Sequence, residues 1–225
     1  MDKLLTVVIP SYNVEKFLNQ TLDSFVCDEA VMKKFEVIVV DDGSKDNTAK
    51  IGKEYADKYP DTFRVISKEN GGHGSTINCG IRNAVGKYFK VVDGDDWVNT
   101  ADFVKLVEDL EKTESEYVFT NYYEYYDDVN RQKAVDFPQF KDGTEYDFAD
   151  VANKVYIPMH ALVIKTSVLK DNNIVIDEKC FYVDVEYVMF PVPFVNKVTF
   201  FDLHVYMYRL APVSYTHLTL PTNRE

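Results

Sequence analysis

The sequence predicts an α/β fold in which a mainly parallel central sheet is flanked by helices. Short β-branched runs alternate with helix-like segments through the first hundred residues, an order typical of such folds. Residues 35–40 read FEVIVV, a nearly continuous apolar run of the kind buried on both faces of a parallel sheet. Repeated strand–helix–strand units are expected to have right-handed crossovers. Ligands of such sheets collect at the carboxyl ends of the strands.

Each element of the first half follows from its local pattern. A helix is expected where Phe17, Leu18, Leu22 and Phe25 recur at helical spacing. The first strand should end at Pro10, which has no N–H group to donate. The expected strands are residues 4–9, 35–40, 63–67 and 87–92, and the expected helices are residues 14–26, 46–59, 75–85 and 97–110.

The pattern changes after Tyr117. The aromatic run TNYYEYYDD predicts a strand or one arm of a hairpin, and a polar connection follows through Gln139. Residues 155–165 and 198–210 are expected to be further strands, with short helices between them. These elements predict a smaller C-terminal region joined to the first half.

Composition restricts the class of partner. The chain has 225 residues, of which 46% are hydrophobic, so it is long enough for one domain with a real core. The 37 acidic residues outnumber the 25 basic ones and give a net charge of -12. This charge repels phosphate backbones, which argues against nucleic acid as a partner. An anionic ligand would need local neutralisation by a metal ion or a few basic groups.

No apolar segment approaches the 18 residues of a membrane span. We therefore expect a cytoplasmic protein without a transmembrane segment, although a peripheral association with the inner face of the membrane stays open. The closing residues SYTHLTLPTNRE match neither the composition nor the periodicity before them and resemble a translated sequencing adaptor. Residues 211–225 are therefore expected to be a non-native or truncated tail, the alternative being an ordinary polar tail.

An acidic cluster follows the strand expected at 87–92. Asp93, Asp95 and Asp96 lie within four residues, and Gly94 relieves the turn between them. Three carboxylates so close together repel one another unless cations intervene. Their oxygens suit Mg²⁺ or Mn²⁺, which commonly completes its shell with water and substrate phosphates. The alternative is a solvated turn whose aspartates cap the next helix.

A second acidic pair, Asp41 and Asp42, lies at the end of the FEVIVV strand. A carboxylate at this edge can accept hydrogen bonds from a nucleobase or a ribose hydroxyl. Ser44 and Asp46 could equally cap the following helix. Both interpretations can hold for different residues of the same stretch.

Two loops add weaker signals. At the end of the first strand, Tyr12 offers an aromatic face for a planar base, and Asn13 could fix the turn. Residues 69–78 read ENGGHGSTIN, in which the glycines permit a loop pressed against a ligand and the following helix presents free N–H groups to phosphate. His73 would touch the ligand or face water. The loop matches neither GxGxxG at the first strand nor GxxxxGK[ST], which disfavours dinucleotide and P-loop binding.

Together the motifs VVIPSYNVEKFL, VVDDGSKDNT and NGGHGSTINCGIRNAVGKYFKVVDGDDW resemble, in order and spacing, the family 2 inverting glycosyltransferases. That family has the GT-A fold, a Rossmann-like fold of nucleotide-diphospho-sugar transferases. The resemblance covers residues 4–100 and extends more loosely through Leu210. It implies a nucleotide-sugar-binding half at residues 1–115 and an acceptor-binding half at residues 116–210 of the same domain.

The resemblance also assigns roles to residues. It implies that the nucleotide is held by Pro10, Tyr12 and Asp42, with Asn13 and His73 beside the donor. The DxD-type motif would hold the ribose and the metal-bound diphosphate through Asp93, Asp95 and Asp96. Of these, Asp96 is expected to be the direct metal ligand and Asp95 its neighbour towards the ribose.

The catalytic base of the family is usually an Asp in an ED-like motif that opens a helix. The corresponding stretch is FYVDVEYV, in which Asp184 takes the Asp position and Val183 stands where the Glu would be. This departure leaves Glu186 as a second candidate for the base, and two exposed carboxylates at a helix start are the alternative. His160 would reach the metal or acceptor, or else be a core histidine. No QxxRW motif follows, which disfavours processive polymer synthesis.

The implied activity is transfer of a sugar from a nucleotide-diphosphate donor, a UDP-sugar being favoured, to a hydroxyl group with inversion. The acceptor would be a saccharide or lipid-linked saccharide in cell-surface or capsular polysaccharide or glycoconjugate synthesis. Two alternatives stay open. A sugar-phosphate nucleotidyltransferase should carry a glycine-rich, basic loop after the first strand, which PSYNVEKFL lacks. An inactive or truncated nucleotide-sugar-binding module would bind donor without turnover.

Overall fold

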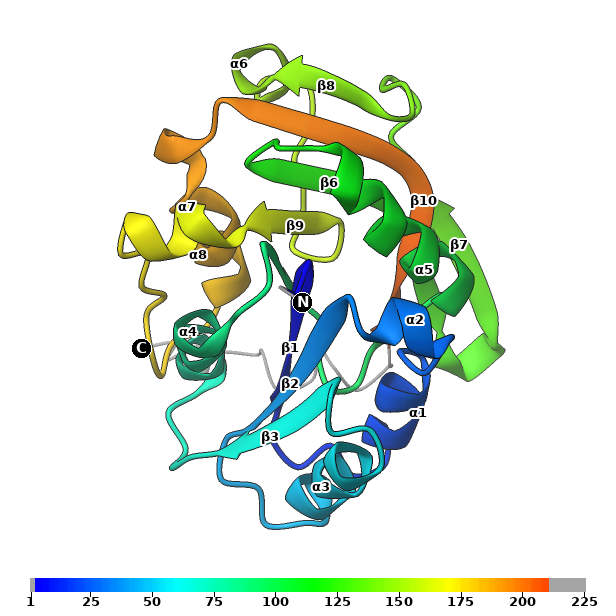
Figure 1. The fold of residues 1–225 in the computed structure, drawn as a ribbon, viewed down its shortest axis with the longest axis vertical. Coiled ribbons are helices and arrows are strands. Elements are labelled where there is room, and N and C mark those ends of the chain that lie inside the picture. Colours follow the sequence, from blue (N-terminus) through cyan, green and yellow to red (C-terminus); the bar gives the residue numbers. More distant parts are fainter. Residues whose placement is uncertain (1–2, 211–225) are drawn as a thin grey trace, which may run out of the picture.

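The computed structural model describes residues 3–210, so the predicted tail at 211–225 lies outside the described part. Within residues 3–210, one sheet of ten strands runs through the protein (Figure 1). Its main path has the order β3-β2-β1-β4-β9-β6-β10-β5, while β7 pairs with β6 and β8 pairs with β10. The sheet therefore continues from the first half into the second, and the two halves share it.

The first half forms the parallel part of the sheet, as predicted. Its strands are β1 (Leu5–Ser11), β2 (Phe35–Asp41), β3 (Phe63–Ser67) and β4 (Tyr88–Val91). All pairings among them are parallel. Its helices are α1 (Leu18–Asp23), α2 (Glu29–Met32), α3 (Thr48–Lys58) and α4 (His73–Asn83). Every residue of β1 and β2 is buried, which explains why FEVIVV lacks regular polar alternation.

The first strand runs beyond its predicted end. Pairing of β1 with β2 continues to Ser11 opposite Asp41, whereas pairing of β1 with β4 ends at Val8 opposite Val91. Beyond that ladder, the amides of Val92 and Gly94 still donate to the carbonyls of Val8 and Pro10. The loop that follows β4 therefore stays attached to the end of β1.

The second half is mixed rather than parallel. Its elements are β5 (Trp97–Val98), α5 (Thr100–Asp109), η1 (Leu110–Lys112), β6 (Tyr117–Tyr126), η2 (Asp127–Val129), β7 (Arg131–Val135), β8 (Thr144–Asp147), α6 (Phe148–Val151), β9 (Leu162–Lys165), α7 (Thr166–Asp171), α8 (Val183–Met189), η3 (Val192–Phe194) and β10 (Lys197–Leu210). Strand β9 is antiparallel to both β4 and β6, while β10 is parallel to β6. The sheet is therefore purely parallel in the first half, as predicted, and mixed in the second, where β6 and β10 form a further parallel pair.

Besides the end of the first strand and the helix expected at 14–26, which is α1, two further predicted boundaries were wrong. The helix expected at 97–110 begins at Thr100, because Trp97 and Val98 pair with β10 and Asn99 caps the helix through the amides of Ala101 and Asp102. The strand expected at 155–165 is reduced to β9. Residues 158–162 form a turn in which the amides of Ala161 and Leu162 donate to the carbonyls of Pro158 and Met159.

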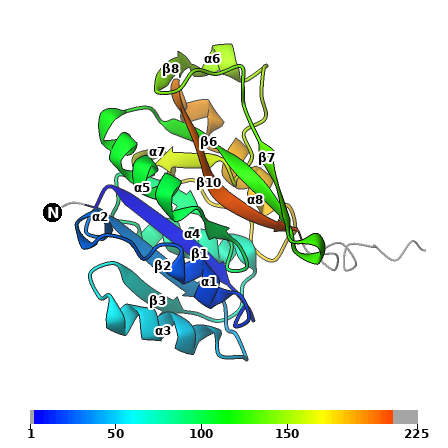
Figure 2. The same cartoon turned by 90° about the vertical axis from the view of Figure 1, so that its right-hand side faces the viewer.

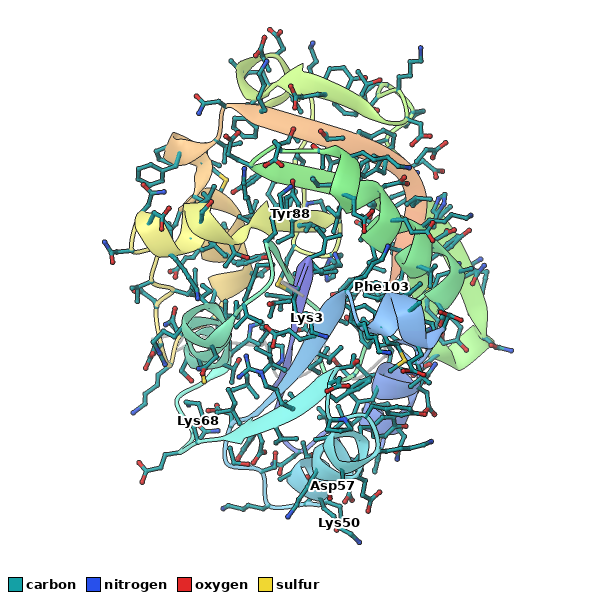
Figure 3. All side chains as sticks on the ribbon, viewed as in Figure 1. Lys3, Lys50, Asp57, Lys68, Tyr88 and Phe103 are labelled. Atoms are coloured by element: carbon teal, nitrogen blue, oxygen red, sulfur yellow. The ribbon has the colours of Figure 1, made fainter. Side chains whose placement is uncertain are left out.

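Helices cover both faces of the sheet (Figure 1; Figure 2, turned by 90°). On one face α4, α7 and α8 contribute to a hydrophobic core, with Ile77, Leu169 and Tyr187 among its members. On the other face α1, α2 and α5 pack on a second core that contains Leu22 and Phe103, the latter labelled in Figure 3. No helix within residues 3–210 is long and apolar enough to cross a membrane.

Candidate active site

The acidic loop lies at the carboxyl edge of the sheet. It follows β4, and the amide of Gly94 donates to the carbonyl of Pro10 at 3.1 Å. A Cβ atom on Gly94 would lie 2.9 Å from the same oxygen, so a side chain would push the loop away from β1. The glycine thus allows the carboxylates to sit directly against the end of the central strand.

Asp93 forms an ion pair with a histidine of the glycine loop. The Nε2 atom of His73 lies 2.9 Å from a carboxylate oxygen of Asp93. Burial, the largest single effect, raises the pKa of Asp93, but the charge and hydrogen bond of His73, together with the charge of His160, lower it overall. Burial also opposes protonation of His73, yet Asp93 and then Asp184 raise the pKa of its imidazole. This reciprocal effect shows that His73 lies in the field of carboxylates from both halves.

Asp96 lies beneath the loop and is only 2% exposed. One carboxylate oxygen accepts the Tyr206 hydroxyl at 2.6 Å, and the other accepts the Arg209 amide at 2.7 Å. Burial, followed by the charges of Asp93 and Asp95, raises the pKa of Asp96 well above its usual range. Both oxygens of Asp96 therefore hold the loop to β10, and its role as direct metal ligand stays a prediction.

Asp95 occupies a different environment in the same loop. It is half-buried, and its carboxylate forms no hydrogen bond to another residue within 3–210. Burial and then the neighbouring charge of Asp93 raise the pKa of Asp95. A half-buried carboxylate that repels its neighbour and accepts no hydrogen bond from another described residue is suited to binding a cation.

Arg209 holds the backbone of the acidic loop. Its Nε donates to the carbonyl of Asp95 at 2.7 Å, while its terminal nitrogens bind Asp127 and Gln20, each at 2.6 Å. The guanidinium also lies over the rings of Phe17 and Trp97, 4.9 and 4.7 Å from their centroids. The end of β10 thereby fixes the acidic loop against α1.

Asp42 organises the glycine loop. Its carboxylate accepts the amides of Gly71 and Gly72 at 2.9 and 2.8 Å, and it also binds Lys68 at 2.6 Å. Lys68 follows β3 and is labelled in Figure 3. Because Asp42 is only 2% exposed, its oxygens face the loop rather than open solvent. The neighbouring Asp41 accepts the amide of Ser44 at 3.0 Å.

The loop after β1 is fixed by Asn13. This residue has a φ of 54°, a conformation that Asn tolerates better than most residues. Its side-chain oxygen accepts the amide of Lys45 at 2.8 Å, and its own amide donates to Ser44 at 3.0 Å. Tyr12 immediately before it is 48% exposed, so its ring is available to a ligand.

A cavity of about 300 Å³ joins residues from both halves of the sequence. Its lining includes His73 and Asp93 from the first half and His160, Asp184 and Tyr208 from the second. Asp184 is the second residue of α8 and is half-buried. The two carboxylates predicted to serve diphosphate binding and proton transfer therefore face one space.

Glu186 lies outside this lining. Its carboxylate accepts the amide of Asp177 at 2.8 Å and thereby fixes the loop before α8. This geometry favours Asp184 over Glu186 as the base. A larger cavity of about 500 Å³ lies beside α6 and α8, but its lining is mostly apolar and contains none of the predicted site residues.

His160 forms the wall of the cavity. Its ring stacks on Tyr208 with centroids 4.0 Å apart and meets Tyr206 edge-on at 4.9 Å. Burial lowers the pKa of His160 to about 4, which keeps the ring neutral at physiological pH. His160 is therefore not a simple core residue, and its low pKa makes it a weak acceptor of protons.

Lys90, which sequence reasoning missed, supports that wall. It is completely buried on β4, and its ammonium donates to the carbonyls of His160 at 2.8 Å and Leu162 at 3.2 Å. The ladder between β4 and β9 ends at Phe89 opposite Ile164, so Lys90 bridges the strands just beyond it. A lysine inside the apolar run YFKVV was the signal that could have identified it.

A model of the family described as Glycosyl transferase family 2 matches residues 6–172. The chain belongs to glycosyl transferase family 2. The match includes the acidic loop, the glycine loop and the end of β1. Asp184 and β10 lie beyond the matched residues, so the family model itself does not place them at the site.

Several family relatives are similar over part of the chain. The uncharacterized glycosyltransferase EpsJ of Bacillus subtilis is 37% identical over 123 residues, which are 55% of this chain and 35% of EpsJ. Glycosyltransferase GlyA of Streptococcus pneumoniae is 33% identical over 125 residues, which are 56% of this chain and 18% of GlyA. The minor teichoic acid biosynthesis protein GgaB of B. subtilis is 33% identical over 111 residues, which are 49% of this chain and 12% of GgaB.

Solved structures extend the likeness to nearly the whole chain. The crystal structure of S. aureus TarS 1-349 with UDP-GlcNAc is 25% identical with a TM-score of 0.76, and the match covers 92% of this chain and 58% of that one. Mannosyltransferase PcManGT from Pyrobaculum calidifontis, in complex with GDP-Man and Mn²⁺, matches at 18% identity with a TM-score of 0.68, over 96% of this chain and 59% of that one. The GT-A fold is thereby confirmed, and the matched part is well short of these proteins' full length.

Proposed function

We propose that the protein is an inverting, metal-dependent glycosyltransferase that moves a sugar from a nucleotide-diphosphate donor to a hydroxyl group of an acceptor. The observation that carries the proposal is the shared cavity of Asp93 and Asp184. A donor diphosphate near the acidic loop and an acceptor hydroxyl near α8 would meet in this space. Family 2 membership supports the class of reaction.

The nucleotide would bind along the carboxyl ends of β1 and β2. The exposed ring of Tyr12 offers a stacking face beside Pro10, and Asn13 holds that loop in place. Asp42 contributes by fixing the amides of Gly71 and Gly72. TarS binds UDP-GlcNAc, which supports a UDP-sugar as the donor.

The acidic loop fits a divalent cation, Mg²⁺ or Mn²⁺. We assign Asp95 as the direct ligand, with Asp93 beside it and Asp96 as the anchor below. The fit rests on the ligand set: two half-buried carboxylates in one loop, of which Asp95 accepts no hydrogen bond from another residue within 3–210. When bound, the ion would supply positive charge to the diphosphate leaving group. A mannosyltransferase of the same fold is seen with GDP-Man and Mn²⁺.

Asp184 would act as the general base. Its carboxylate faces the cavity from the start of α8, where it can take the proton of an acceptor hydroxyl as that oxygen attacks the anomeric carbon. His73, with its raised pKa, would keep Asp93 ionised beside the donor. A single displacement of this kind inverts the anomeric centre.

The acceptor is proposed to be a saccharide or lipid-linked saccharide of cell-surface polysaccharide or glycoconjugate synthesis. GgaB, a relative, is described as a minor teichoic acid biosynthesis protein, which supports this class. A lipid-linked acceptor would place the reaction on the cytoplasmic side of the membrane.

The test is a screen of UDP-, GDP- and dTDP-sugars for Mn²⁺-dependent thermal stabilisation, followed by NMR assignment of the product anomer. We expect one nucleotide class to stabilise the protein with Mn²⁺ and Asp95→Ala to abolish this effect. Lys105→Ala, an exposed residue of α5, is the control and should behave as wild type. Stabilisation without metal, or a product that retains the donor configuration, would refute the proposal.

A further inference from the structure

We propose that Phe181 and Tyr182 form a binding platform for a pyranose ring of the acceptor saccharide. The inference rests on the proposed function, because it names the acceptor side of the same cavity. Both residues line the cavity that contains Asp93 and Asp184. Only Val183 separates them from Asp184 in the sequence, so a ring resting on them would place its hydroxyl groups beside the proposed base.

Both aromatic side chains are unusually open to solvent. Phe181 is 79% exposed and Tyr182 is 71% exposed, the two largest exposed fractions of any aromatic residue within 3–210. Exposed aromatic surface at the mouth of a polar cavity is typical of ligand sites. The exposure therefore marks a binding surface that a partner molecule covers.

The loop that carries the two rings is fixed at several points. The side chain of Asn78 both donates to the carbonyl of Ile176 at 2.8 Å and accepts its amide at 2.9 Å. Further along, the amide of Lys179 donates to the carbonyl of Gly71 at 3.1 Å. The exposed rings thus belong to a loop held by α4 and the glycine loop, which preorganises them for a ligand.

The backbone geometry at Tyr182 also supports a binding role for this loop. Tyr182 has a φ of 64°, a left-handed conformation that costs free energy for a large side chain. It stands immediately before α8 and presents its ring at the cavity instead of continuing the helix. Strain of this kind is common where the surrounding structure holds a residue for binding.

The chemistry of the cavity matches a sugar better than a purely apolar ligand. A pyranose ring has an apolar C–H face that packs on aromatic rings, and hydroxyl groups that need hydrogen-bond acceptors. Phe181 and Tyr182 supply the aromatic face, and Asp184 supplies an acceptor. The stacked pair of His160 and Tyr208 lines the same cavity, so it presents aromatic surface from a second element.

Exposed apolar residues continue beyond the cavity, at Met189, Phe190 and Phe194. A membrane surface is therefore the competing partner for this side of α8. The favoured partner is a saccharide because the two most exposed rings line the cavity with the carboxylates. The experiment below separates the two.

The experiment measures binding of methyl glycosides of glucose, galactose and N-acetylglucosamine by saturation-transfer NMR, with UDP and Mn²⁺ present. At least one glycoside should bind the wild type. Phe181→Ala and Tyr182→Asn should each weaken that binding about tenfold because each removes one aromatic contact. A tenfold change in affinity corresponds to about 1.4 kcal/mol. Asparagine is chosen at 182 because it tolerates the left-handed conformation.

Phe194→Ala is the matched control, because this exposed ring does not line the cavity. It should bind the glycosides as the wild type does, and all variants should bind UDP within twofold of the wild type. Phe181→Tyr, which keeps an aromatic ring at this position, should bind the glycosides as the wild type does. The inference is overturned if no glycoside binds while UDP does, or if the two variants bind glycosides normally. Binding to phosphatidylglycerol vesicles is measured in parallel. The inference is also overturned if Phe181→Ala and Tyr182→Asn lose vesicle binding but keep glycoside binding. Failure of the proposed function shows separately, as absence of nucleotide binding.

Discussion

Tyr206 donates its hydroxyl hydrogen to Asp96 at 2.6 Å across 110 positions of the sequence. The same hydroxyl oxygen accepts the amide of Asp93 at 3.1 Å. One side chain of β10 therefore binds both ends of the acidic loop. The geometry of a motif in the first half depends on a strand close to the end of the described chain.

Removing that hydroxyl group should destabilise the protein. In Tyr206→Phe, a buried carboxylate and a buried amide each lose a partner, which should cost about 1–3 kcal/mol. Urea unfolding measures this loss as a lower midpoint. Tyr123→Phe is the control, because the Tyr123 ring stacks on His204 and its hydroxyl forms no hydrogen bond within residues 3–210. Equal midpoints for Tyr206→Phe and the wild type would contradict the prediction.

Arg209 should be needed for metal-assisted nucleotide binding. Arg209→Lys keeps one positive charge but cannot reach Asp95, Asp127 and Gln20 together. We expect the affinity for UDP with Mn²⁺ to fall about tenfold, or about 1.4 kcal/mol, by calorimetry. Arg131→Lys, at an exposed position of β7, should leave the affinity unchanged. An unaltered affinity in Arg209→Lys would show that the acidic loop keeps its shape without the guanidinium.

Lys90 should make stability depend on pH. Burial lowers its pKa from 10.5 to about 7 in the folded protein, so between these values the unfolded chain binds more protons. Stability should therefore rise with pH from about 7 towards 10, by about 1.4 kcal/mol for each pKa unit separating the two states. Thermal unfolding of the wild type and Lys90→Met is measured across this pH range. The melting temperature of the wild type should rise steadily relative to that of Lys90→Met as the pH increases. If the two melting temperatures change in parallel with pH, the effect is excluded.

Asn78 should control the placement of the acceptor loop. Asn78→Asp removes the donor to the Ile176 carbonyl and puts a carboxylate at a site that is 3% exposed. We expect a loss of about 1–3 kcal/mol in urea unfolding and weaker acceptor binding at unchanged UDP affinity. Asn83→Asp is the control, since Asn83 donates within its own helix turn, to Cys79. Normal acceptor binding in Asn78→Asp would contradict the prediction, because it would show that acceptor binding does not depend on this anchoring of the loop.

The sequence was sufficient for the elements that depend on local pattern. The strand at 35–40 was predicted within one residue of β2 because both its faces are buried. Residues 155–161 misled the prediction, since an apolar run does not distinguish a strand from a buried turn. Strands β7 and β8 were missed because they are largely exposed and polar, so that tertiary pairing alone defines them.

The candidate site was predictable in composition but not in arrangement. Spacing brought Asp93, Asp95 and Asp96 into one loop, yet which carboxylate faces the cavity depends on Tyr206 and Arg209, more than 100 positions away. The same holds for Asp42, whose partners in the glycine loop follow β3. Side-chain direction in these loops follows from tertiary contacts that periodicity does not encode.

The most direct test of the account is Asp184→Asn, with donor binding and sugar transfer measured separately. We expect the donor dissociation constant to stay within twofold of wild type, because the acidic loop is unchanged. Transfer should fall by roughly 10²–10⁴-fold, the usual contribution of a general base. Wild-type transfer in Asp184→Asn would contradict the assignment of the base and, with it, the role given to the shared cavity.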